Sequence, residues 1–443
     1  MNKITELVTS NYKYLSIVIL IMIGFVIALS TYFSWVSADA AYYLSVARDI
    51  ASGYIPYSDI NMHYTPLMMY INSLIYFVFK SPNYLFFLLT QFLIIGLASI
   101  LFFKLLIDCF SIKRNSAFFI VTLCALSILS SDGTYIVLEV YSFLFVIIGG
   151  LFFFRKDYLW AGFLIGFSFF IKQYSVLNYM PFYFLLFFYK SKREISWTPI
   201  ILFSLGGLIC LGLFLLIFLG IYEIPFEQLL SQLSGTEYST WASSNTSSIF
   251  SYFIGVKNLL LLLLPILLFL LFFGETKSYY IIFLLIGILV NILPTFVKSY
   301  QHYLINTYPY VFILLGIVLD NALGKTKQMK LAYFAIALIL FSTFVARIVK
   351  HKHKNYDQEL ISSKVKKVIP KGSEIYMHGE IRYLYILNNY RNPALEKVGY
   401  SYMAKDLQEN FPKASLSNKL TGEITDIIPL NNKDSIYIYN KNF

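Results

Sequence analysis

The chain has 443 residues, of which 58% are hydrophobic, 19% aromatic and only 13% charged. Soluble domains carry about 25% charged residues, so this composition excludes an ordinary soluble protein and indicates a polytopic membrane protein. The formal net charge of +11 does not indicate nucleic-acid binding, because much of the basic charge falls in short turns between apolar runs, where it sets membrane orientation. The three cysteines lie in or beside apolar runs and predict no disulfide framework or thiolate metal site.

Apolar runs of roughly 20 residues recur along most of the chain and predict membrane-spanning helices. The first run follows Lys3 and Lys13, and its length favours a retained helix over a cleaved signal peptide. We expect about eleven spans, at residues 14–36, 84–106, 115–131, 135–154, 158–172, 174–190, 198–221, 251–274, 278–297, 302–320 and 331–349.

The apolar segment 66–79 is short for a span, and its treatment decides the orientation of the chain. If it spans, the basic turns at 113–114, 155–156 and 190–193 fall outside the cell. If it is a re-entrant or surface helix, all three lie inside, as the positive-inside rule requires. We therefore expect 37–83 to be one long external region, with a cytoplasmic N-terminus and an external C-terminus in the plasma membrane.

The 37–83 region combines two acids with a short amphipathic helix. Asp39 comes almost directly out of the first apolar run, a helix is expected over 40–52, and Gly53 ends it. A turn at Tyr54–Tyr57 leads to the second acid, Asp59. Carboxylates at a membrane surface are costly unless they are solvated or partnered, which favours a functional role over a helix cap or a turn.

Two polar regions lie outside the predicted spans on the same side. The loop 222–250 is acidic and rich in hydroxyl groups, which is typical of a lid or binding loop but also of a mobile linker. Residues 350–443 have the composition of a soluble domain, with strand-like runs at 373–377 and 435–439 and a helix expected at 380–388. We predict two domains, a transmembrane domain over 1–349 and a small external α/β domain over 350–443.

The residues of the 37–80 stretch resemble the first external loop of the GT-C superfamily of integral-membrane glycosyltransferases, in its aminoarabinose-transferase and protein O-mannosyltransferase-like branch. The matching positions are Asp39, Tyr43-Leu44, Ala47-Arg48, Gly53, Pro56-Tyr57, Asp59, Tyr64 and Pro66. The runs 162–173 and 302–317 are similar to the family's glycine-rich helix ending in lysine and to its histidine- and tyrosine-led helix. Two family features are absent, since Ala40 follows Asp39 and His63-Tyr64-Thr65-Pro66 replaces a lysine-containing Asn-Lys-Pro-Pro.

The resemblance implies an inverting transfer of a sugar from a polyprenyl-phosphate donor to an acceptor on the outer face of the membrane. Such a transfer needs a base for the acceptor's proton and cations or oriented donors on the leaving phosphate. Asp39 is the candidate general base. The candidate substrate-binding residues are Asp59, Arg48, Lys172, His302, Tyr303, Glu139, Lys298 and Tyr64.

Each candidate also has a plain structural interpretation. Arg48 can face water from a surface helix, Lys172 can extend to the membrane interface, and His302 can cap a helix. No cofactor is expected, although Asp39 and Asp59 have the oxygen ligands that Mg²⁺ or Mn²⁺ prefers. A nucleotide-sugar donor is disfavoured, because no glycine-rich phosphate loop joins a strand to a helix.

Two other functions stay open at this stage. A lipid or glycan transporter, or flippase, is the main alternative, but such proteins place ionisable residues mid-membrane on broken helices of repeated halves, and no repeat is visible here. A membrane scaffold whose external domain binds a partner is the third. The sequence leaves the donor sugar and the acceptor, whether glycan, lipid or protein, open.

Overall fold

The structure is a computed structural model, and it describes only part of the chain. The described residues are 36–60, 62, 64–80, 84–129, 131, 136–188, 197–234, 278–297, 301–322, 358, 362–363, 365–367, 376–377, 415–417, 424–429 and 435–439. The predicted spans 251–274 and 331–349, the helix at 380–388 and all but the last residue of span 14–36 lie outside these residues.

The chain divides into two compact units, each of which gathers segments that are distant in sequence. The bundle unit comprises Met1–Leu29, Leu89–Leu215 and Thr246–Arg347. The loop unit comprises Ser30–Leu88, Leu216–Asn245 and Ile348–Phe443. The loop unit therefore groups the 37–83 region with the part of the chain that follows residue 348, whereas the sequence-based division separates them at residue 349.

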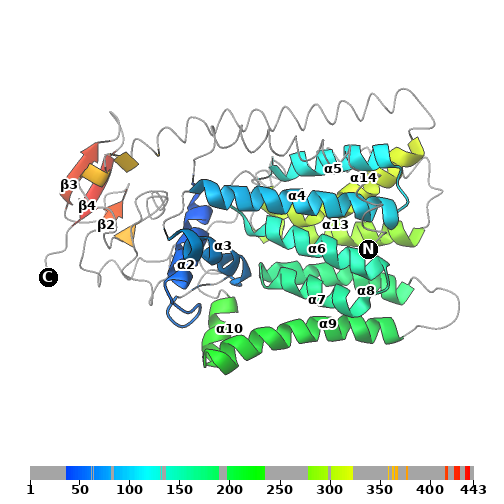
Figure 1. Cartoon of the computed structure of the whole chain (residues 1–443), viewed down its shortest axis with the longest axis horizontal. Coiled ribbons are helices and arrows are strands. Elements are labelled where there is room, and N and C mark those ends of the chain that lie inside the picture. The colour runs from blue at the N-terminus through cyan, green and yellow to red at the C-terminus, as the bar shows by residue number, and fades with distance from the viewer. Residues whose placement is uncertain are drawn as a thin grey trace. The chain divides into compact units, whose positions relative to one another are not determined.

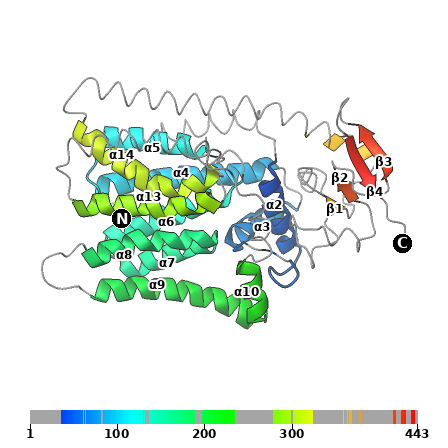
Figure 2. The same cartoon turned by 180° about the vertical axis from the view of Figure 1, so that it is seen from behind.

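The helices of the bundle unit run side by side (Figures 1 and 2). Their bounds are α4 (Tyr84–Asp108, whose first turn belongs to the loop unit), α5 (Arg114–Ile128), α6 (Leu138–Phe154), α7 (Tyr158–Phe169), η2 (Gln173–Asn178), α8 (Tyr179–Phe188), α9 (Trp197–Leu215), α13 (Ser278–Val297), η4 (Gln301–Thr307) and α14 (Tyr308–Ala322). Among the described residues, three helices are long and apolar enough to cross a membrane: Tyr84–Asp108, Trp197–Ile221 and His302–Asp320. The chain is an integral membrane protein, while the total of eleven spans stays a prediction.

Several apolar runs that the sequence predicts as uninterrupted contain tighter or wider helical turns. The segments η2 and η4 are 3-10 helices, and the end of the run after α9 is a π-helix, η3 (Leu216–Ile221). The predicted span 302–320 is confirmed as a helical segment long and apolar enough to cross a membrane, and its first turns are 3-10. A membrane tolerates such breaks where polar groups on neighbouring helices form hydrogen bonds with the backbone groups and polar side chains of the broken segment.

Glycines bring α7 and α9 unusually close together. A Cβ atom added at Gly162 would lie 1.9 Å from the backbone oxygen of Phe203, and one added at Gly206 would lie 2.0 Å from that of Leu159. Small residues at such crossings let helices of a membrane bundle pack backbone to backbone. The glycine-rich run that begins at Gly162 thus has a packing role.

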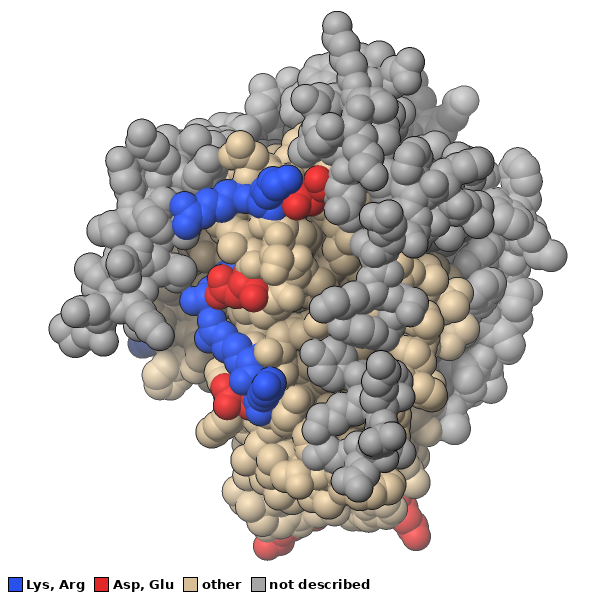
Figure 3. All heavy atoms as spheres, turned by 90° about the vertical axis from the view of Figure 1, so that its right-hand side faces the viewer, with Lys and Arg blue, Asp and Glu red and all other residues tan. Residues whose placement is uncertain are grey.

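The two described basic turns of the bundle unit lie at one end, where Lys and Arg side chains lie among Asp and Glu (Figure 3). Arg155, after α6, lies 3.5 Å from Asp108 at the end of α4, and Lys113, before α5, lies 4.0 Å from Asp320 in α14. Because α6 runs from Leu138 to Phe154, Glu139 lies at the opposite end of this helix. The two described basic turns therefore lie at the same end of the bundle, and the turn at 190–193 lies outside the described residues.

The loop unit begins with α2 (Ala38–Ala51), followed by α3 (Leu67–Phe79). The helix expected at 40–52 starts two residues earlier, and its N-cap is Ser37, whose hydroxyl accepts from the Ala40 N–H at 3.0 Å. The structural interpretation of Asp39 as a cap is therefore wrong. Gly53 has φ +96° and ends the helix as predicted, with its N–H donating to Ile50 and that of Tyr54 to Asp49, the Schellman pattern of helix ends.

The segment 222–250, expected as a loop, contains a helix in the loop unit, α10 (Phe226–Ser234). The missed signal is the sequence FEQLLSQLS, which buries Leu229 and exposes Phe226, Leu230 and Ser231. The start of the helix follows Pro225, whose carbonyl accepts from the Leu229 N–H at 3.0 Å. Residues 235–250 lie outside the described part of the chain.

The end of the chain forms a four-stranded sheet in the order β1-β2-β4-β3. The strands are β1 (Tyr376–Met377), β2 (Ser415–Ser417), β3 (Ile424–Pro429) and β4 (Ser435–Tyr439). The predicted strands at 373–377 and 435–439 are therefore confirmed at β1 and β4. Strands β3 and β4 pair antiparallel, with an irregularity between Ile424 and Asp426, and β1 pairs with β2 in parallel.

Candidate functional site

The candidate base lies in the first turn of α2. Asp39 is partly exposed, and an acid in this position is favoured by the helix dipole and by the unsatisfied N–H groups of the first turn. The start of the helix is fixed by Gln358, whose side chain accepts from the Val36 N–H at 2.9 Å and donates to the Val36 carbonyl at 3.0 Å. A buried amide 322 residues further along the chain therefore holds the backbone just before α2.

Arg48 is buried, so the structural interpretation that it faces water from a surface helix is wrong. Its side chain is buried, and its Nε lies 3.4 Å from Oδ1 of Asp49, which is buried as well. Sequence reasoning missed Asp49, although an acid next to a candidate cation was a usable signal. The pair is a local ion pair of the loop unit, near the Tyr76 hydroxyl in α3.

Asp59 is engaged within its own turn. Its Oδ2 accepts from the Ile55 N–H at 2.7 Å, and its Oδ1 accepts from the Ser58 hydroxyl at 3.4 Å. The backbone of Ile55 also accepts from the Asp59 N–H at 2.9 Å. This is a turn-forming carboxylate, and any contact with substrate uses the remaining lone pairs of its two oxygens.

Tyr64 lies in an aromatic cluster against α2. Its ring packs edge-on at 5.8 Å from Tyr42 and 5.6 Å from Tyr43, and its carbonyl accepts from the Tyr57 hydroxyl at 2.7 Å. Burial raises the pKa of Tyr57 well above its ordinary value, so this hydroxyl stays protonated and remains a donor. Tyr64, Tyr57 and α2 are therefore held together in the loop unit.

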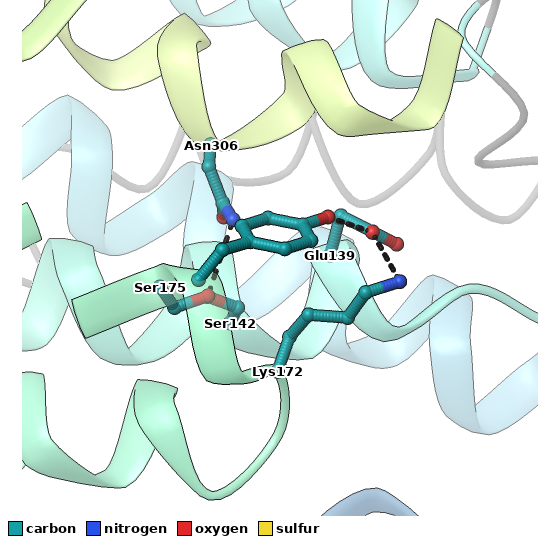
Figure 4. A network of polar contacts seen from close by, with 6 residues as sticks. Glu139, Ser142, Lys172, Ser175 and Asn306 are labelled. Carbon is teal, nitrogen blue, oxygen red and sulfur yellow. Dashed lines mark hydrogen bonds and ion pairs between the residues drawn. The ribbon is translucent and has the colours of Figure 1, made fainter. Parts of the chain in front are cut away.

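The bundle unit contains a buried ion pair at the opposite end from its basic turns. Nζ of Lys172 lies 3.0 Å from Oε1 of Glu139, with side chains 4% and 1% exposed. The same Oε1 accepts from the Tyr174 hydroxyl. Figure 4 shows the two side chains pointing toward one another. Glu139 extends from α6, and Lys172 is the residue that precedes η2.

Aromatic rings surround the Lys172 ammonium group. Its Nζ lies 5.2 Å from the ring centroid of Tyr174 and 4.9 Å from that of Tyr303, both within range of a cation–π interaction. His302 packs edge-on against Tyr303 at 4.9 Å and interacts electrostatically with Glu139. The structure thus brings together four predicted residues: Glu139, Lys172, His302 and Tyr303.

A chain of buried polar side chains continues from this pair into the bundle. Ser142 and Ser175 share a hydrogen bond of 2.8 Å, and Asn306 donates to the Ser175 hydroxyl at 3.2 Å (Figure 4). Asn178 accepts from Asn291 at 3.1 Å and from Tyr310 at 3.0 Å. These residues were missed, although asparagines inside apolar runs are themselves a signal.

The candidate site residues divide between the two units of the chain. Asp39, Arg48, Asp59 and Tyr64 belong to the loop unit, and Glu139, Lys172, His302 and Tyr303 belong to the bundle unit. The structure brings the four bundle-unit residues together, and the convergence of both groups on one substrate stays a prediction. Lys298 lies outside the described residues.

The expected ligands for a cation show no metal-binding arrangement. In the described part of the chain, no group of three or more His, Cys, Asp or Glu side chains is placed to hold a metal ion. Both oxygens of Asp59 accept hydrogen bonds within its turn and keep lone pairs for a further contact.

Comparison with known proteins gives a fold and no sequence family. No family model and no curated protein sequence matches the chain. Two solved structures of ArnT from Cupriavidus metallidurans match it, each with a TM-score of 0.60 and 11% sequence identity. The structure of ArnT bound to undecaprenyl phosphate covers 97% of this chain and 98% of its own, and the apo structure covers 95% and 97%.

The chain has the fold of ArnT. The match extends over nearly the whole of both chains. At 11% identity the likeness establishes architecture, and residue roles must come from the chain's own geometry.

Proposed function

We propose that the protein is a membrane glycosyltransferase that transfers a sugar from a polyprenyl-phosphate donor to an acceptor at the outer face of the membrane. The observation that carries the proposal is the full-length likeness to ArnT, a protein whose structure contains undecaprenyl phosphate. The GT-C resemblance of the 37–80 stretch supports the same reaction independently. The donor sugar is a hexose or pentose, and the setting is glycan biosynthesis at the cell envelope.

In the proposed reaction Asp39 removes the proton from the acceptor hydroxyl. The acceptor oxygen then attacks the anomeric carbon, a new C–O bond forms with inversion, and the bond to phosphate breaks to release polyprenyl phosphate. A partly exposed carboxylate in the first turn of a helix, where the helix dipole favours negative charge, suits this role.

Lys172 is the proposed contact for the donor phosphate, on which negative charge builds as the bond breaks. An ammonium group has three N–H donors, so it can hold Glu139 and a phosphate oxygen at once. Because Lys172 is buried beside Tyr174 and Tyr303, the contact requires these rings to shift. His302, Tyr303, Arg48 and Lys298 are further proposed contacts, with Glu139, Asp59 and Tyr64 orienting the sugar or the acceptor.

A transfer assay with a panel of polyprenyl-phosphate sugars in membranes tests the proposal. Wild-type protein is expected to transfer one of them, and Asp39→Asn is expected to abolish transfer while the protein remains folded. The matched control is Asp157→Asn, since Asp157 is an exposed residue before α7 whose side chain makes no cap hydrogen bond. Normal transfer by a folded Asp39→Asn protein would remove Asp39 from the mechanism.

One observation favours lipid or glycan flipping as a second candidate. The 3-10 segments η2 and η4 interrupt two apolar runs and are joined through Ser175 and Asn306, and broken helices are typical of transporter binding sites. The same membranes distinguish the two functions, because a flippase moves the labelled lipid across the bilayer without forming a transferred product.

A further inference from the structure

Two glutamines of α10 hold the turn that carries Asp59. The Tyr57 carbonyl accepts from Nε2 of Gln228 at 2.6 Å and from Nε2 of Gln232 at 3.0 Å. Oε1 of Gln232 accepts in turn from the Met62 N–H at 3.1 Å. We call Gln228 and Gln232 the glutamine clasp. Their side-chain amides form hydrogen bonds with the backbone of Tyr57 and Met62, as a neighbouring β-strand would do with its own backbone.

The clasped residue has a backbone conformation that a bulky side chain seldom adopts. Tyr57 has φ +67°, in the left-handed region where non-glycine residues are uncommon. Its N–H donates to the Ile60 carbonyl at 2.9 Å, and its ring packs edge-on against Phe218 at 5.1 Å. Such conformations persist where surrounding contacts determine them several times over, and they concentrate at functional sites.

The position of the clasp on α10 follows from helix geometry. Residues four apart lie on one face of a helix, so both amides reach the same turn. Leu229 is the side chain that α10 buries, while Glu227, Leu230 and Ser231 are exposed. With so little apolar burial, the amide hydrogen bonds carry much of the attachment of α10 to the turn.

We propose that Gln228 and Gln232 are positioning residues that set the backbone of residues 57–62 and thereby orient Asp59 and Tyr64 for substrate. The link to Tyr64 is direct, because the Tyr57 hydroxyl donates to the Tyr64 carbonyl at 2.7 Å. The link to Asp59 runs through the backbone of the same turn, where Ile60 pairs with Tyr57. This inference rests on the proposed glycosyl transfer for its functional part.

The test combines hydrogen exchange with transfer kinetics on the full-length protein in lipid nanodiscs. The main variant is Gln228→Met/Gln232→Met, which keeps side-chain length and removes every bond of the clasp. Gln232→Glu separates the two contacts of this residue, because a carboxylate still accepts from Met62 but does not donate to Tyr57. The control is Ser231→Ala, whose exposed hydroxyl bonds within α10 at 2.9 Å.

In the double variant we expect amide exchange over 57–62 to speed up at least ~10-fold and the KM for the donor or the acceptor to rise about 5- to 30-fold. That range corresponds to about 1–2 kcal/mol, the lower part of what three net hydrogen bonds contribute. In Gln232→Glu the Met62 amide should stay protected while KM still rises, and Ser231→Ala should match wild type. A rise in KM marks positioning, since a protein that merely unfolds loses kcat at constant KM.

Unchanged exchange over 57–62 in the folded double variant would overturn the clasp itself. Faster exchange with unchanged KM, or a loss confined to kcat, would overturn its positioning role. Failure of the wild-type protein to transfer any donor would refute the proposed function instead, and the exchange measurement would then decide alone whether the clasp holds the turn.

Discussion

Neutralising one member of the Lys172–Glu139 pair should destabilise the protein strongly, whereas neutralising both members should not. At 3.0 Å two unit charges attract by about 5.5 kcal/mol for an effective dielectric constant of about 20, before desolvation is subtracted. Removing one partner of a buried pair leaves an uncompensated charge and costs about 3–5 kcal/mol, while replacing both by neutral groups is often neutral. We expect Glu139→Gln and Lys172→Met each to lose about 3–5 kcal/mol of unfolding free energy, and Glu139→Gln/Lys172→Met to recover most of it.

The free energies can be measured by unfolding in mixed detergent micelles. The matched control is the exposed pair of Arg155 and Asp108, 48% and 37% exposed at 3.5 Å, whose neutralisation should cost no more than about 1 kcal/mol. If the double variant of the buried pair is as unstable as the sum of the singles, the two charges do not compensate each other and the reasoning fails.

The same variants separate a structural role of Lys172 from a role in donor binding. A charge-assisted contact with phosphate is worth about 1.5–3 kcal/mol, so loss of the ammonium group should lower kcat/KM for the donor by roughly 10- to 100-fold. We therefore expect Lys172→Ala and the stable double variant both to show this loss. Full activity in the double variant would mean that the pair only holds the bundle together.

Three further predictions concern packing, the end of α2 and topology. Gly206→Ala places a methyl group 2.0 Å from a backbone oxygen of α7 and should lower the free energy of unfolding by about 1–3 kcal/mol. Gly212→Ala is the control on the same helix, because no atom lies within 4 Å of the new methyl group, and it should be neutral or slightly stabilising in the same unfolding assay. Gly53→Ala should cost about 1–2 kcal/mol through backbone strain alone, since φ is +96° and no atom lies within 4 Å of the new methyl group; an unchanged midpoint would contradict the strained turn. In intact cells, Ser58→Cys should react with an impermeant thiol reagent and Lys156→Cys should be protected, and the reverse pattern would invert the topology and move the proposed site to the cytoplasm.

The sequence by itself determined the features that depend on local patterns. The apolar runs located α4, α6 and α9, because burial in lipid requires long apolar helices whatever their neighbours are. Gly53 marked the end of α2, since few other residues adopt positive φ at low cost. The alternation in SIYIY placed β4 at Ser435–Tyr439 to the residue.

The tertiary structure alone decided where helices break and which polar groups pair. In the 3-10 segment η2, Ser175 pairs with Ser142 and Asn178 with Asn291, and these partners lie on other helices and leave no trace in the local pattern. The clasp of α10 on Tyr57 was hidden for the same reason, because its hydrogen bonds join residues up to 175 positions apart. The local sequence determines which side chains can be buried or can form hydrogen bonds. Long-range packing determines which partners they contact.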